Sequence, residues 1–212
     1  CNPNNPTGLL VEKPLLEKIL KRCQEFDILM AVDECFLDFV PTPEKYTLKE
    51  YLETYDNLFL LKAFTKRYAM AGVRLGYGLC GNKGLLRKME GVCQPWNVSS
   101  MAQAAGLAAL QEREYVEKGR QVTFQELAYL KEELTALGYP VYPSQANYVF
   151  FTGPADLYEK LEQKKILIRD CSNYTGLSKG YYRVAVKKHE ENQQLVRALK
   201  EIDRTKVENV IL

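Results

Sequence analysis

Two short apolar runs constrain this chain most, because each has the length of a strand and each leads into a polar residue that can do chemistry. ILMAV occupies positions 28–32 and stops at Asp33, and NLFLL occupies positions 57–61 and ends just before Thr65 and Lys66. A continuous apolar run of this length is typical of a strand buried on both faces in a parallel sheet. Open α/β sheets bind ligands outside the carboxyl ends of their strands, so we predict a site that includes Asp33 and Lys66.

The remainder of the chain predicts further helices and strands in two domains. Apolar residues recur at helical spacing over 12–25, and residues 98–137 have the composition of helix. Beyond Gly138 the pattern changes to a compact α+β unit. We expect strands there at 146–151, 165–169 and 181–186, and helices at 155–164 and 189–204. We therefore divide the chain into a first domain of residues 1–125 and a smaller second domain of residues 126–212.

Composition excludes several classes of protein. Lysine and arginine number 29 against 27 aspartate and glutamate residues, and no basic stripe could follow a nucleic-acid backbone. We therefore do not expect nucleic acid as a partner. No apolar run approaches the length of a membrane span, so we do not expect a membrane as a partner either. Six cysteines without a CxxC pair, and the single histidine His189, argue against a zinc site or a disulfide framework. This cysteine usage suits a reducing cytosol, and we predict a cytoplasmic protein without a bound metal.

The stretch FTKRYAMAGVRLGYG, at positions 64–78, sets Lys66 among small residues. Taken alone, such a lysine is most often a solvated surface residue, and Asp33 could be a helix cap or the partner of an arginine. Pyridoxal phosphate would use both side chains, since it needs a lysine amine for a Schiff base and an acid beside its pyridinium nitrogen. Positive charge from Arg67 or Arg74 would help to keep that amine unprotonated.

Three motifs together resemble the signature of a known family. They are CNPNNPTG at 1–8, AVDECFLDF at 31–39, and the stretch at 64–78. In this order and spacing they are similar to the fold-type-I pyridoxal-phosphate enzymes of the class I/II aminotransferase group. The resemblance implies an α/β fold like that of aspartate aminotransferase, with a large cofactor-binding domain built on a mainly parallel sheet and a small α+β C-terminal domain. It also implies a homodimer.

The resemblance assigns several cofactor contacts of that family to residues of this chain. Asn5 would hydrogen-bond the phenolic oxygen of pyridoxal phosphate, and Asp33 would pair with its pyridinium nitrogen. Lys66 would form the Schiff base. Thr65 and Arg74 would hold the cofactor phosphate, the arginine through a charge-assisted pair of hydrogen bonds.

The C-terminal motifs narrow the resemblance to one branch. IRDCSNYTGL at 168–177, followed by YYRVAV, resembles the histidinol-phosphate aminotransferase branch and most closely its threonine-phosphate decarboxylase members. This implies that Arg183 binds the substrate carboxylate, that Arg169 contributes to binding the substrate phosphate, and that Asn5 also faces the substrate. Without the motif, each arginine would be taken for a surface ion pair.

The resemblance implies a reaction and leaves two alternatives. The first expectation is decarboxylation of L-threonine O-3-phosphate to aminopropanol phosphate in cobalamin biosynthesis. The alternative is an aminotransferase acting on histidinol phosphate or another amino acid, and a hypothesis of another class is a non-catalytic binding protein with the same fold. Phe36 and Ala63 depart from the family, which often has Tyr and a hydroxyl residue there. The family's phosphate loop and stacking aromatic precede the NPTG motif, so we expect a C-terminal portion that is inactive alone.

Overall fold

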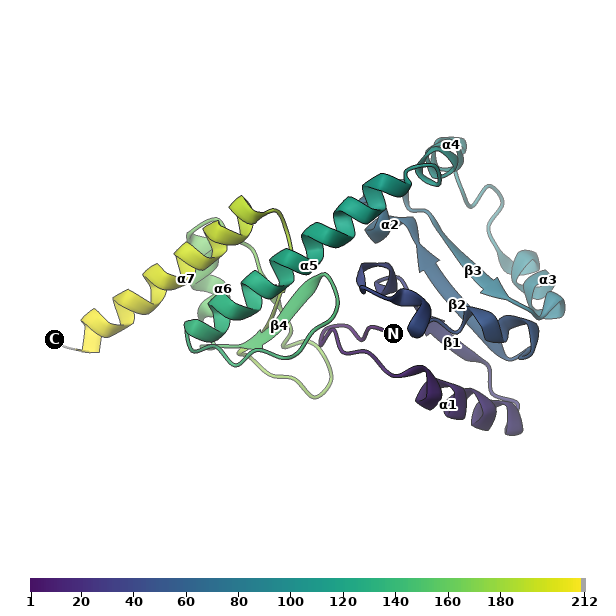
Figure 1. Ribbon diagram of the computed structural model, residues 1–212, viewed down its shortest axis with the longest axis horizontal. Coiled ribbons are helices and arrows are strands. Elements are labelled where there is room, and N and C mark those ends of the chain that lie inside the picture. The colour runs from purple at the N-terminus through teal and green to yellow at the C-terminus, as the bar shows by residue number, and fades with distance from the viewer. Residues whose placement is uncertain (211–212) are drawn as a thin grey trace. The chain divides into compact units, whose positions relative to one another are not determined.

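The computed structural model describes residues 1–210 and divides into two compact units (Figure 1). The N-terminal unit consists of Cys1–Pro3 and Leu10–Arg120, and the C-terminal unit consists of Asn4–Leu9 and Gln121–Leu212. The division after Arg120 falls within the long helix α5 (Arg113–Ala136), as does the domain boundary that we placed between residues 125 and 126. Each unit is described by itself below.

The sheet of the N-terminal unit contains the two strands that the apolar runs predict. Its strands, in the order β1-β2-β3, are β1 (Met30–Asp33), β2 (Leu58–Ala63) and β3 (Gly76–Cys80). The first two strands are parallel, as expected, with Asp33 opposite Leu61. β3 pairs with β2 in the antiparallel sense, so the sheet described here is mixed.

The prediction that the first strand is buried on both faces is wrong. Val32 is buried, whereas Ala31 is exposed and Met30 and Asp33 are partly exposed. One face of β1 and β2 packs in a core cluster with α1 (Lys13–Glu25), to which the helix contributes Leu16 and Leu20. The apolar run thus marks a strand whose burial alternates, and its first residues precede the strand.

Short helices complete the N-terminal unit. Helix α1 matches the predicted range 12–25. Helices α3 (Lys83–Val92) and α4 (Ser100–Ala109) have N-caps of the usual kind, in which Asn82 and Ser99 accept hydrogen bonds from Leu85 N and Ala102 N. The other helical segments are α2 (Phe64–Arg67) and the 3-10 turns η1 (Leu37–Phe39), η2 (Pro43–Lys45), η3 (Lys49–Glu53) and η4 (Ala71–Val73).

The C-terminal unit is an antiparallel sheet packed with helices. Its strands lie in the order β4-β6-β5, and a core cluster joins side chains of this sheet to α5 and α7. The elements are β4 (Tyr148–Thr152), α6 (Leu157–Gln163), β5 (Arg169–Asp170), β6 (Tyr181–Ala185) and α7 (His189–Val210). The strand predicted at 165–169 is wrong except for its last residue, because Lys165 has φ 62° and turns the chain after α6.

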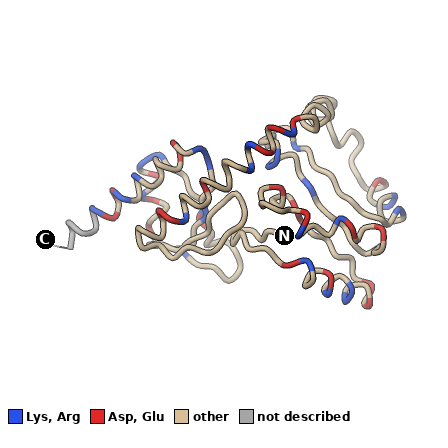
Figure 2. Tube along the Cα trace, viewed as in Figure 1, with Lys and Arg blue, Asp and Glu red and all other residues tan. Residues whose placement is uncertain are grey.

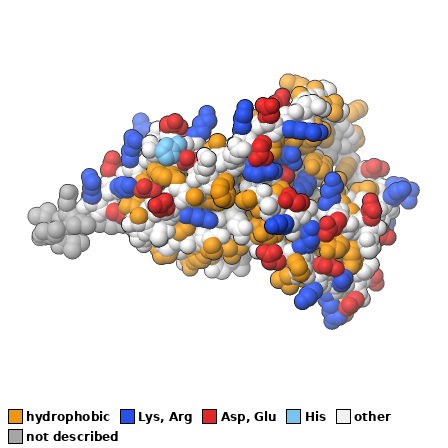
Figure 3. Space-filling model, viewed as in Figure 1, with side chains coloured by type: hydrophobic (Ala, Val, Ile, Leu, Met, Phe, Trp, Pro, Cys, Tyr) orange, Lys and Arg blue, Asp and Glu red, His pale blue; other side chains and the backbone are white. Residues whose placement is uncertain are grey.

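The surface carries mixed charge and some exposed apolar side chains. Figure 2 shows lysine and arginine residues interspersed with aspartate and glutamate along the trace. Figure 3 shows hydrophobic side chains over α4, where Met101 is 82% exposed and Leu107 is 69% exposed. Among residues 1–210, none of the helices combines the length and the apolar character needed to span a bilayer.

Candidate active site

Asp33 and Lys66 lie at the same edge of the N-terminal sheet. Asp33 is the last residue of β1, and Lys66 follows the end of the parallel neighbour β2 by one turn of α2. Parallel strands present their carboxyl ends at one edge, so the two side chains start from the edge where α/β proteins bind ligands. The chain turns there because Phe64 N donates a hydrogen bond to Leu75 O at 3.1 Å, which closes the loop between β2 and β3.

The Lys66 amine has no polar partner within the described residues. It is exposed, and its Nζ lies 5.5 Å from the centroid of the Phe36 ring. Among residues 1–204, whose side chains the structure describes, neither an ion pair nor a side-chain hydrogen bond holds it. Because no such contact holds this amine, which lies just beyond the end of β2, it is available for covalent chemistry.

Asp33 accepts hydrogen bonds and yet has no cationic partner in the described part of the chain. Its Oδ1 accepts a hydrogen bond from Cys35 N at 2.9 Å, and the Cys1 thiol lies 3.7 Å from Oδ2. The alternative that Asp33 pairs with an arginine is therefore wrong for these residues. Burial, with a smaller contribution from Asp33, raises the pKa of the Cys35 thiol to about 12, so the thiol stays neutral beside the carboxylate.

The other residues of this unit that were predicted to act on the cofactor make few polar contacts. Arg74 adopts the left-handed conformation with φ 57°, and its Nη1 donates a hydrogen bond to Ala71 O at 3.1 Å. The Thr65 hydroxyl is partly exposed beside Lys66. Arg67 instead pairs with Asp38 at 3.0 Å, so its charge is already partly neutralised.

The C-terminal unit brings together the three residues that resemblance assigns to the substrate. In the antiparallel pair of β5 and β6, Arg169 lies directly opposite Arg183. The Arg183 guanidinium donates a hydrogen bond to Asn5 Oδ1. Like charges directly opposite in a sheet are destabilising unless something neutralises them, and no carboxylate among the described residues forms an ion pair with either arginine. This pair is therefore suited to an anionic ligand.

Aromatic and amide side chains that the sequence had not singled out hold the two arginines. The Arg183 Cζ lies 5.1 Å from the centroid of the Tyr148 ring, and the Arg169 Cζ lies 5.8 Å from that of Tyr174. Asn173 Oδ1 accepts a hydrogen bond from Arg169 Nη2 at 3.0 Å, and the Tyr174 hydroxyl donates to Asn5 Oδ1 at 3.4 Å. Asn173 and Tyr174 belong to the SNYTGL motif, which could have revealed them. Tyr148, in contrast, is one of several aromatic residues in a strand.

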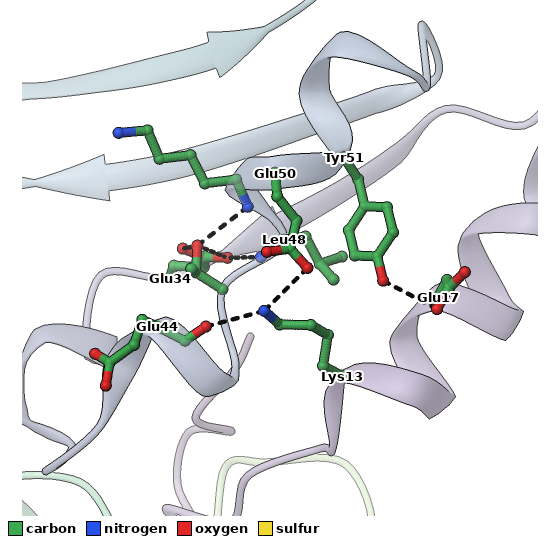
Figure 4. A network of polar contacts seen from close by, with 9 residues as sticks. Lys13, Glu17, Glu34, Glu44, Leu48, Glu50 and Tyr51 are labelled. Atoms are coloured by element: carbon green, nitrogen blue, oxygen red, sulfur yellow. Dashed lines mark hydrogen bonds and ion pairs between the residues drawn. The ribbon is translucent and has the colours of Figure 1, made fainter.

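A buried carboxylate next to Asp33 was also missed. Glu34 is fully buried and accepts hydrogen bonds from Leu48 N at 3.0 Å and from the Thr47 hydroxyl at 2.8 Å (Figure 4). Lys62 Nζ pairs with its Oε2 at 2.8 Å. This network anchors the loop after β1 and thereby fixes the backbone that carries Asp33.

The fold agrees with that of the proteins to which this chain is similar. A model of the family described as aminotransferase class I and II matches residues 1–199. The threonine-phosphate decarboxylase of Salmonella typhimurium is 36% identical over 206 residues, which cover 95% of this chain and 56% of the decarboxylase. The crystal structure of the histidinol-phosphate aminotransferase from Clostridium acetobutylicum is 32% identical with a TM-score of 0.91, over 96% of this chain and 63% of that one.

A third comparison concerns the fold alone. The histidinol-phosphate aminotransferase from Sinorhizobium meliloti, solved in complex with pyridoxal-5'-phosphate, is 23% identical with a TM-score of 0.83, over 96% of this chain and 56% of that one. The predicted fold class, that of the fold-type-I pyridoxal-phosphate enzymes, is thus confirmed. The chain belongs to the aminotransferase class I and II family, whose members are pyridoxal-phosphate-dependent enzymes. It spans little more than half the length of the curated relatives that it matches.

Proposed function

We propose that this chain carries the lysine, the acid and the phosphate contacts of a pyridoxal-phosphate enzyme. The proposal is supported most by the position and contacts of Lys66 and Asp33. They lie at the carboxyl ends of two neighbouring parallel strands, and neither forms an ion pair in the described part of the chain. A charged carboxylate without a cation fits the protonated ring nitrogen of the cofactor, and a free amine fits its aldehyde. Thr65 and Arg74 would hold the phosphate, and Asn5 the phenolic oxygen.

The chain's own residues supply binding, charge and proton transfer. When bound, pyridoxal phosphate supplies an electron sink for the charge that develops at the substrate α-carbon. Asp33 would keep the ring nitrogen protonated by its negative charge. Lys66 would hold the cofactor covalently and would serve as the base or acid that moves a proton at the substrate α-carbon. A non-catalytic binding protein would have no use for these two groups together.

The substrate that we propose is L-threonine O-3-phosphate, decarboxylated to aminopropanol phosphate in cobalamin biosynthesis. Two adjacent arginines suit a small molecule with two anionic groups, and threonine phosphate has a carboxylate and a phosphate. Arg183, held by Asn5 and Tyr148, would bind the carboxylate, and Arg169 the phosphate. The likeness to the Salmonella typhimurium decarboxylase, at 36% identity, favours the same substrate.

The second candidate is an aminotransferase acting on histidinol phosphate or another amino acid. It is favoured by the TM-score of 0.91 to the Clostridium acetobutylicum enzyme. Histidinol phosphate has no carboxylate, so this substrate would leave one of the two opposed arginines without an anion. Because of this mismatch, an aminotransferase acting on histidinol phosphate is our second choice.

The two candidates are separated by assaying both reactions in the full natural protein loaded with pyridoxal phosphate. CO2 release from L-threonine O-3-phosphate is expected, with slow or no keto-acid-dependent transamination of histidinol phosphate. Brisk transamination without CO2 release would overturn the decarboxylase proposal in favour of the aminotransferase.

A substitution tests the assignment of the carboxylate contact. Each charge-assisted hydrogen bond contributes about 1.5 to 3 kcal/mol, so Arg183→Gln should lower kcat/KM for threonine phosphate roughly tenfold or more. Arg197→Gln is the matched control, because Arg197 is an exposed arginine of α7. Unchanged turnover in Arg183→Gln would show that the carboxylate binds elsewhere.

A further inference from the structure

None of the residues assigned to the cofactor lines a small cavity of the N-terminal unit. Its volume is about 130 Å³, and residues of α2, β2, β3 and the start of α5 line it. About 10 to 15 Å³ suffices for one water molecule, so the cavity has room for several waters or a small ion. Neither Lys66 nor Arg74 contributes to its wall.

The charged side chains of this cavity leave positive charge uncompensated. Lys62, Arg67 and Arg113 line it, together with one acid, Asp38. Asp38 pairs with Arg67 at 3.0 Å. The buried Glu34, which does not line the cavity, pairs with Lys62 at 2.8 Å. Arg113 forms no ion pair with any residue in the described part of the chain. Three cations thus face two carboxylates.

Hydrogen-bond donors accompany this charge. The Tyr77 side chain lines the cavity, and burial raises the pKa of its phenol, so the hydroxyl remains a donor at neutral pH. Arg67 Nε is buried without a hydrogen-bond partner, so the donors of this guanidinium are incompletely used. Phe64 and Leu110 supply an apolar wall that limits the size of what can enter.

We propose that this cavity is a second anion site of the chain and that it binds inorganic phosphate between Arg113, Arg67 and Tyr77. Phosphate carries between one and two negative charges near neutral pH and accepts several hydrogen bonds at once, which matches two guanidinium groups and a phenol. A monoanionic carboxylate would leave more of these donors unused. The site does not depend on the function proposed above, because it shares no residue with the cofactor or substrate contacts.

The test uses the Tyr77 phenol as a local reporter in the full natural protein. The ¹³Cζ NMR signals of labelled tyrosines are followed as inorganic phosphate replaces chloride at constant ionic strength, and the Tyr77 signal is assigned with Tyr77→Phe. The Tyr77 signal should shift saturably. Arg113→Gln should raise the phosphate concentration for half-saturation at least tenfold, since it removes a charge-assisted contact.

Two matched variants keep the test specific. Arg87→Gln changes an exposed arginine of α3, and Arg74→Gln removes an arginine assigned to the cofactor, so neither should alter the Tyr77 titration. A Tyr77 signal that does not respond to phosphate would overturn the proposal. An equal response in wild type and Arg113→Gln, with unchanged thermal unfolding, would overturn it as well.

Discussion

At the scale of single residues, the most specific role that we propose is that of Asp33. Its carboxylate sits between a backbone amide and two thiols, and no described cation neutralises it. Asp33→Asn keeps the shape and removes the charge, so the cofactor should still attach while turnover falls roughly 100-fold, the size expected for one lost electrostatic contact in an active site. Asp27→Asn, an exposed position with φ 52° that asparagine tolerates, is the control. Steady-state assays and absorbance report the two effects; equal turnover in Asp33→Asn would mean that Asp33 is structural.

The thiol beside Asp33 provides a prediction about pH. Because burial and Asp33 raise the pKa of Cys35 to about 12, its reactive thiolate should be scarce at pH 8 and become abundant only as the pH approaches that value. Alkylation with iodoacetamide at increasing pH, read by mass spectrometry, should therefore label the exposed Cys93 well before Cys35. Asp33→Asn should lower the pKa of Cys35, since the charge and hydrogen bond of Asp33 both raise it. Cys35 labelling as fast as that of Cys93 at pH 8 would contradict this environment.

At the scale of elements, the buried ion pair between Lys62 of β2 and Glu34 of the loop after β1 should dominate local stability. Lys62 is 13% exposed and Glu34 is fully buried. Lys62→Met would leave Glu34 charged and without its cation, at an expected cost of about 3 to 5 kcal/mol in the free energy of unfolding. Urea unfolding measures this, and adding Glu34→Gln to Lys62→Met should recover most of the loss. Lys21→Met, which removes an exposed ion pair of α1, should change stability little. A small effect of Lys62→Met would show that water or another group compensates Glu34.

The elements also show what local sequence can predict. Helix α1 and strand β2 followed from periodicity and from an apolar run, and both were confirmed. Strand β3 was missed because its sequence, GYGLC, has glycine at alternate positions, and its pairing is decided by the neighbouring strand. The range 165–169 has the composition of a strand, yet the left-handed Lys165 turns the chain there.

The same contrast holds for the candidate site. The positions of Asp33 and Lys66 were predictable because Asp33 ends β1 and Lys66 lies in the short helix that directly follows β2, so local order fixes where they lie. The environment of the arginines was not, since Asn5 and Arg183 meet only through long-range folding. The Tyr148 ring lies near the Arg183 guanidinium because β4 pairs with β6, and local sequence does not predict that register.

At the scale of the whole molecule, the family resemblance predicts a homodimer, and we propose this assembly for the full natural protein. Sedimentation equilibrium across a range of concentrations should give twice the mass of one chain. A single-chain mass at all concentrations would contradict the dimer but not the assignment of Lys66, which rests on its position after β2.

The covalent attachment of pyridoxal phosphate to Lys66 is the claim on which the rest depends. The full natural protein is loaded with the cofactor, reduced with borohydride, digested and analysed by mass spectrometry. We predict one pyridoxyl group, on Lys66. Lys62 is the natural internal control, since it lies on β2 in the same peptide region but is paired with Glu34. A label on Lys62, or no label on any lysine, would contradict the assignment of this chain as the lysine-bearing part of a pyridoxal-phosphate enzyme.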